Sequence, residues 1–198
     1  MNIVGLDSLV FGVDDVDACA RYFTDYGLTA AGDGRFEALD GTAVVIRPQS
    51  DASVPAALET GSMLRKTVYG VADQDTLDAI AAELGSDRDV KTLDDGSIET
   101  TDDFGFALCF QITVRKTISL PGETVNAPGA AIQRPANVIA ADPNVAPKPR
   151  TLSHIVYFVP DAEKFESFYA DRLGFVTTDR FTGVGPFMRP AGTQEHHT

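Results

Sequence analysis

The chain has 198 residues, of which 43% are hydrophobic and 23% are charged, proportions typical of a globular protein with one or two domains. Its net charge of −13 argues against nucleic acid and against an anionic membrane as partners, because both would repel it. No run approaches the roughly 20 apolar residues of a membrane-spanning helix, and the first residues lack the basic segment and apolar core of a secretion signal.

Three stretches of the chain repeat one pattern, in which a β-rich apolar run stops at an aspartate and a helical pattern follows. The runs are residues 9–13, 67–71 and 155–159, and the aspartates are Asp15, Asp73 and Asp161. The length and β-branched content of the runs predict strands. Each aspartate stands where a helix N-cap accepts hydrogen bonds from free backbone N–H groups.

The helical patterns show apolar residues at spacings of three and four, which predicts one buried face on each helix. These residues are Cys19, Tyr22, Phe23 and Tyr26, then Leu77, Ile80, Ala81 and Leu84, and finally Phe165, Phe168, Tyr169 and Leu173. Gly27, Gly85 and Gly174 follow the three patterns, and we expect each of them to end its helix in the left-handed conformation.

Further turns complete the repeating unit. Asp40-Gly41 and Asp95-Gly96 divide β-rich runs as hairpin turns do, and residues 183–186 form a looser turn pattern. The sequence therefore predicts an α+β fold of repeated βαβββ modules. We expect two complete modules in residues 1–116, a linker in 117–150 that holds six of the eleven prolines, and an incomplete third module in 151–198.

Both cysteines, Cys19 and Cys109, lie on predicted buried faces of a helix and a strand. Buried free cysteines act as small hydrophobic residues, and unpaired thiols are typical of a reducing compartment. We therefore expect a cytoplasmic protein.

The repeat, together with residues 152–161, Phe168-Tyr169 and residues 173–175, resembles the vicinal oxygen chelate superfamily. That superfamily includes glyoxalases, bleomycin-resistance proteins, epimerases and type I extradiol ring-cleaving dioxygenases. Three features favour the dioxygenases. A pair of modules without histidine precedes the histidine-bearing one, residues 126–129 are similar to their interdomain crossing, and Glu195-His196-His197-Thr198 resembles their His-His-Thr stretch.

His154 is the predicted metal ligand. It stands one residue before the third run, where the first two modules have Ser8 and Lys66. Strand alternation places His154 on one face with Val156 and Phe158, from which its imidazole can point into a curved sheet. The resemblance implies Fe(II), or Mn(II), held by two histidines and one carboxylate, which leaves positions for a catechol and dioxygen.

The family's second histidine ligand and its glutamate lie in a fourth module, and the histidines of this chain are only residues 154, 196 and 197. We therefore expect that the sequence stops before that module, and that the 198-residue chain by itself is inactive and binds Fe(II) weakly.

The resemblance assigns proton transfer during oxygen activation to His197, a role suited to a side chain that titrates near neutrality. Alternation places His197 and Glu195 on one face and His196 on the other, so we expect His196 to lie outside the ligand set. Val156, Phe187 and His196 are predicted to line the substrate pocket.

Structural alternatives exist for each of these residues. His154 is in that case a hydrogen-bonded core histidine, Phe187 is core packing, and His196 and His197 belong to a tail or the start of a purification tag.

The function predicted is non-haem iron-dependent cleavage of a small aromatic diol by O2, in aromatic-compound catabolism, by a homo-oligomer. The first alternative is a metal-poor binding or resistance protein that sequesters a small aromatic ligand. The second is a glyoxalase-like or epimerase-like enzyme, for which Glu195 is the one residue able to supply the carboxylate ligand on the module's last strand.

Overall fold

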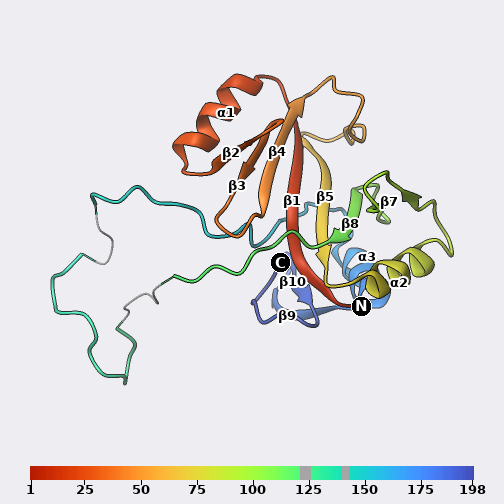
Figure 1. Cartoon of the computed structure of the whole chain (residues 1–198). Helices are drawn as coiled ribbons and strands as arrows, with labels where there is room; N and C mark the ends of the chain where they lie inside the picture. The colour runs from red at the N-terminus through yellow and green to blue at the C-terminus, as the bar shows by residue number, and fades with distance from the viewer. Residues whose placement is uncertain (121–125, 140–142) are drawn as a thin grey trace.

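The computed structural model describes residues 1–120, 126–139 and 143–198 (Figure 1). Residues 121–125 and 140–142 of the predicted linker therefore lie outside the described part. The first part of the chain contains β1 (Ile3–Val13), α1 (Val16–Asp25), β2 (Thr29–Gly32), β3 (Arg35–Glu37), β4 (Ala43–Pro48), β5 (Leu64–Val71), α2 (Gln74–Leu84), β6 (Lys91–Thr92), β7 (Ile98–Thr101) and β8 (Ala107–Ile112). The last part contains α3 (Ala162–Ser167), the π-helix η1 (Phe168–Arg172), β9 (Phe175–Phe181) and β10 (Gly185–Pro190).

The first two modules form one eight-stranded sheet in the order β2-β3-β4-β1-β5-β8-β7-β6. In each module the first strand pairs in parallel with the last, β1 with β4 and β5 with β8. The two modules join where β1 and β5 run antiparallel in the middle of the sheet. The predicted βαβββ repeat is confirmed for both modules.

The register shows that Ser8 and Lys66 occupy the same place in their modules. Ser8 lies opposite Ala43, the first residue of β4. Thr67 lies opposite Leu108, which puts the preceding residue Lys66 beside Ala107, the first residue of β8.

The third repeat departs from the prediction at its first strand. Residues 151–159 form no strand, although α3, η1 and the β9–β10 hairpin follow in the expected order. In the complete modules this strand lies between two partner strands, and the described part of the chain offers the third run neither partner. Without a partner the backbone cannot form a hydrogen-bonded ladder, so the alternation of the run remains but its pairing does not.

The third repeat packs on the second module, with α3 beside α2 (Figure 1). Buried side chains from both form one core: Ile3, Leu6 and Leu9 of β1, then Tyr69, Val71, Leu77, Ile80, Leu84, Ile98, Leu108 and Phe110 of the second module, and Phe168, Tyr169, Leu173, Phe175 and Met188 of the third repeat. Because these side chains leave water together, the third repeat is held to the first two modules by apolar burial.

The predicted N-caps and turns agree with the structure, since Asp15, Asp73 and Asp161 each accept a hydrogen bond from a first-turn N–H. Two details differ. Gly85 has φ −65° rather than a left-handed value, and Arg172 Nη2 donates to the Glu83 carbonyl near the end of α2. Local sequence cannot show a partner that arrives from 89 residues away.

The helix faces and the cysteines were predicted with one error. The helix α2 buries Leu77, Ile80 and Leu84 as expected. In α1, by contrast, Tyr22 and Tyr26 are 61% and 59% exposed. Both cysteines are free, Cys109 buried and Cys19 half-buried. Among the described residues, no helix combines the length and apolar character needed to span a bilayer.

Candidate functional site

The three histidines lie together. The ring centroids of His154 and His197 are 4.7 Å apart, and those of His196 and His197 are 5.1 Å apart. His154 comes from the extended segment before α3, whereas His196 and His197 belong to the tail after β10. The fold thus brings the predicted metal ligand and the predicted proton carrier into contact.

An aromatic wall adjoins this cluster. The ring of Phe187 on β10 lies 5.1 Å from that of His197 and 5.7 Å from that of His196, and Phe181 packs edge-on against Phe187 at 5.0 Å. Val156, the third predicted pocket residue, is 68% exposed on the face that His154 also shares. Phe187 and His196 therefore border His197, and Val156 lies along the extended segment.

The hydrogen bonds of the cluster engage the Nδ1 atoms. Ser153 Oγ lies 3.1 Å from His154 Nδ1, and the Nδ1 atoms of His196 and His197 are 2.9 Å apart. A hydrogen bond at Nδ1 fixes the ring and leaves Nε2 to act elsewhere. The Nε2 atoms of His154 and His197 have no hydrogen-bond partner among the described residues.

The tail is tied to the hairpin. Thr198 N donates to the Met188 carbonyl at 2.8 Å, and Thr178 Oγ1 donates to the carbonyl of His196. The expectation that His196 faces away from His197 was wrong, because residues 191–198 form no strand and their side chains do not alternate. Instead His196 packs on Phe187, with its Nε2 3.8 Å from Asp179 Oδ2.

The electrostatics of the cluster favour a neutral His197. Partial burial lowers the pKa of His197 from its usual value, and the neighbouring His154 and His196 lower it further. A neutral imidazole can accept a proton or bind a metal, and an imidazolium can do neither.

Metal binding needs more donors than this cluster provides. Within residues 1–120, 126–139 and 143–198, no three histidine, cysteine, aspartate or glutamate side chains are placed to hold one ion. Two imidazoles with free Nε2 atoms fit part of a 2-His-1-carboxylate set, and the carboxylate is lacking. The described residues therefore do not form a complete metal site.

A cavity of about 350 Å³ lies on another side of His154. Tyr22, Phe23, Tyr26 and Leu28 line it from the first helix and the residues after it, together with Ala38, Thr42, Ala43 and Val44, and with Pro149, Thr151, Leu152, Ser153 and His154. Sequence reasoning missed these walls, because it assigned Tyr22 and Tyr26 to a buried helix face. It also missed Ser153, which alternation places opposite His154.

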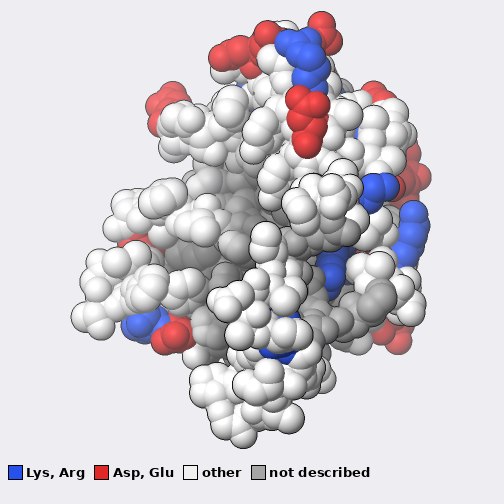
Figure 2. Space-filling model, turned by 90° about the vertical axis from the view of Figure 1, so that its left-hand side faces the viewer, with Lys and Arg blue, Asp and Glu red and all other residues white. Residues whose placement is uncertain are grey.

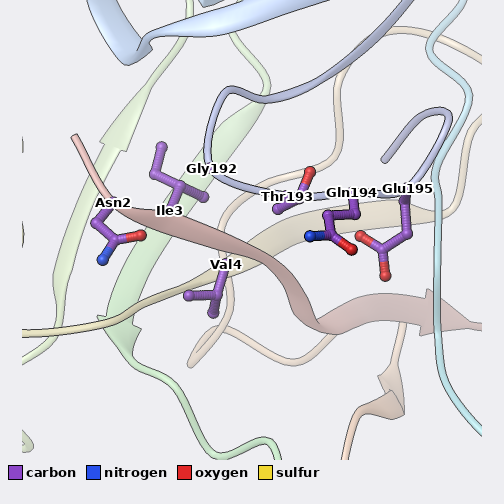
Figure 3. A pocket seen from close by; sticks show the side chains of 7 residues that line it. All are labelled: Asn2, Ile3, Val4, Gly192, Thr193, Gln194 and Glu195. Carbon is purple, nitrogen blue, oxygen red and sulfur yellow. The ribbon is translucent and has the colours of Figure 1, made fainter.

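A second hollow, of about 440 Å³, lies between the start of β1 and the loop after β10 (Figure 3). Its lining includes Asn2, Gln194 and Glu195. Glu195 Oε1 is 4.0 Å from Arg115 Nη1, so this carboxylate is associated with an arginine.

Charged side chains of both signs are interspersed on the face of the molecule seen in Figure 2. They form no continuous basic surface on this face, in keeping with the net charge of −13.

No protein-family model matches the sequence, and no curated protein matches it. Solved structures do. A Mn(II)-bound glyoxalase from Novosphingobium aromaticivorans has a TM-score of 0.66 and 18% identity over 99% of this chain and 60% of its own. The 2,2',3-trihydroxybiphenyl 1,2-dioxygenase of Sphingomonas wittichii has 0.56 and 20%, over 90% and 60%. The homoprotocatechuate 2,3-dioxygenase of Arthrobacter globiformis has 0.61 and 16%, over 96% and 56%.

The chain spans 56–60% of the length of these three structures. At such identities the likeness concerns the fold, and function must be argued from the site. The chain has the fold of the vicinal oxygen chelate superfamily, which these glyoxalase and extradiol dioxygenase structures share.

Proposed function

We propose that this chain is part of an extradiol dioxygenase that opens the ring of a small aromatic diol with O2. The observation that carries the proposal is the contact of His154 with His197 beside Phe187, in a fold shared with such enzymes. The first two modules carry Ser8 and Lys66 at the position that precedes the repeated run, and in the third repeat that position holds His154. The third repeat is thus the chemical one.

The cofactor implied is Fe(II), or Mn(II), with His154 as a ligand through Nε2. The described residues lack a carboxylate for this set, so the proposal places the remaining ligands outside the 198 residues. We propose further that the enzyme is a cytoplasmic homo-oligomer of aromatic-compound catabolism.

His197 has the geometry of a proton carrier. Its Nε2 is free of protein partners in the described chain, and its lowered pKa keeps the imidazole neutral, so it can accept a proton from a diol hydroxyl. Phe187 offers its ring as a wall for the aromatic substrate, and offset or edge contacts between rings stabilise such packing.

The test is oxygen uptake and formation of the coloured ring-opened product by the complete native protein, loaded with Fe(II) and given catechol. His197→Phe should slow turnover by roughly 10²–10⁴-fold, the usual contribution of a positioned acid–base group. Ser8→Ala, at the matching place of the first module, should turn over as the wild type does. Full activity in His197→Phe, or no ring opening of any catechol by the wild type, would refute the proposal.

One observation favours a second candidate, a binding protein that sequesters a small aromatic ligand without metal. The cavity of about 350 Å³ has aromatic walls, including Tyr22 and Tyr26, and His154 at its edge. Pockets of this size hold small ligands. Micromolar binding of an aromatic diol in the presence of a chelator, weakened by Tyr22→Ala, would support this candidate over the enzyme.

The glyoxalase-like alternative has less support from the geometry. It needs Glu195 as a metal ligand, and Glu195 is directed toward β1 and lies near Arg115 (Figure 3).

A further inference from the structure

The segment that carries His154 is fixed in place without a sheet. Residues 153–159 make no backbone–backbone hydrogen bond in the described chain. An extended segment with a free backbone would normally be mobile, so the position of His154 must depend on other contacts. Two buried hydroxyl groups, one from each of the first two modules, supply them.

The first contact lies two residues before His154. Leu152 N donates to Thr42 Oγ1 at 2.6 Å, and Thr42 is fully buried just before β4. Thr42 Oγ1 in turn donates to Asp40 Oδ1 at 2.6 Å, which directs the lone pair of the hydroxyl toward Leu152. Arg115 Nη2 completes this end by donating to the carbonyls of Leu152 and Leu6.

The second contact lies three residues after His154. Tyr157 forms a hydrogen bond with Thr67 Oγ1, and Thr67 is fully buried on β5. The ring of Tyr157 is enclosed by Phe106 at 4.8 Å and Phe165 at 5.2 Å. Burial raises the pKa of Tyr157 to about 12, so its hydroxyl is protonated at neutral pH and can donate.

The two contacts bracket His154 on the side away from its exposed face. Ile155 and Tyr157 point into the protein, whereas His154 and Val156 point out. Fixing the backbone at residues 152 and 157 therefore fixes the direction of the imidazole, which in turn meets His197 at 4.7 Å.

We infer that Thr42 and Thr67 are positioning residues, by which the two histidine-free modules set His154 against His197. This assigns a role to both modules that neither the repeat nor the comparisons supply. The inference rests on the proposed function only for the chemical importance of the two histidines, and the contacts themselves need no metal or substrate.

The test uses the imidazole ¹H–¹³C correlation spectrum of the 198-residue chain, in which His154→Gln, His196→Gln and His197→Gln assign the three histidines. Thr42→Val and Thr67→Val remove one hydroxyl each with little change in shape. We expect both variants to shift the His154 and His197 resonances and to lose the nuclear Overhauser contact between the two rings. Thr42→Ser and Thr67→Ser, which retain the hydroxyl, should restore the contact.

The matched control is Thr100→Val. Thr100 is buried in the second module and donates to the Asp89 carbonyl, so its loss has a similar structural cost away from His154. Its histidine spectrum should match that of the wild type. The inference is overturned if the Thr42→Val and Thr67→Val spectra match the wild type, if Thr100→Val shifts them equally, or if the serine variants fail to restore the contact.

Failure of this test and failure of the proposed function are distinguishable, because the spectrum is recorded without iron. Should either valine variant fail to fold, its serine variant still decides the matter: a wild-type ring contact there supports the role of the hydroxyl, and a lost contact refutes it.

Discussion

Replacing Asp102 by asparagine should stabilise the protein at neutral pH. Asp102 is 5% exposed in the loop before β8. Its Oδ1 accepts hydrogen bonds from Phe104 N at 2.8 Å and Phe106 N at 2.9 Å, while its Oδ2 is buried with no partner in the described part of the chain. Burial raises the pKa of Asp102 from 3.8 to about 6, against the lowering effect of those backbone hydrogen bonds.

The size and sign of the effect follow from this pKa. A rise from 3.8 to about 6 corresponds to about 3 kcal/mol at 1.36 kcal/mol per unit. Between these values the folded state holds a proton that the unfolded state has released, so the free energy of unfolding falls as pH rises from about 4 to about 6. Above that range the full cost of the buried carboxylate is present.

Asp102→Asn keeps the accepting oxygen and removes the charge. Urea denaturation followed by circular dichroism from pH 4 to pH 8 should show the variant more stable than the wild type at pH 7.5, by at most about 3 kcal/mol. The gain should be reduced by the cost of burying an unpaired amide, and the difference should shrink toward pH 4.

Asp95→Asn is the control of opposite sign. Hydrogen bonds from the Ser97 side chain and backbone lower the pKa of Asp95, so its ionised form is favoured by folding and the variant should lose stability at pH 7.5. An Asp102→Asn protein that is less stable than wild type at pH 7.5, or that keeps the wild-type pH dependence between 4 and 6, would refute the reasoning.

Three further predictions concern the third repeat. Arg172→Met should lower the free energy of unfolding by about 1–2 kcal/mol in urea denaturation, because Arg172 joins η1 to Glu83 and Asp87 at the end of α2; equal loss in Arg21→Met, on the exposed side of α1, would contradict this. Gly174→Ala should cost about 1 kcal/mol in the same assay, since Gly174 has φ +73° with open space around it; no loss would contradict the strain. The 198-residue chain should retain much less than one iron per chain after desalting, measured by atomic absorption, because its described residues form no complete ligand set; stoichiometric iron would contradict that.

Local patterns predicted most of the fold. N-caps, hairpin turns and the apolar spacing of α2 depend on residues within a few positions of one another, and these were correct. The repeat then multiplied the evidence, because Asp15, Asp73 and Asp161 mark the same point in each unit. Two βαβββ modules and their joining in one sheet follow from such information.

The errors lie where structure depends on distant partners. Residues 155–159 have the composition of a strand and no strand to pair with in the described chain. Gly85 was expected to close α2 alone, yet Arg172 reaches the last turn from the third repeat. A propensity describes what a segment can do, and pairing decides what it does.

The candidate site was predicted in part. The repeat singled out His154, and the resemblance singled out His197, which the structure places in contact with it. Thr42 and Thr67 could not be found from sequence, because their roles arise from hydrogen bonds that span 110 and 90 residues. His196 was misplaced because alternation was applied to a tail that is not a strand.

The central claim is that the third repeat binds the metal through His154 and that the first two modules do not. Its most direct test is Mn(II) retention by the complete native protein, measured by electron paramagnetic resonance after dialysis, for wild type, His154→Ala, Ser8→Ala and Lys66→Ala. We predict that His154→Ala loses the bound Mn(II) signal, while Ser8→Ala and Lys66→Ala retain it at the wild-type level. Full retention in His154→Ala, or equal loss in Ser8→Ala or Lys66→Ala, would contradict the claim.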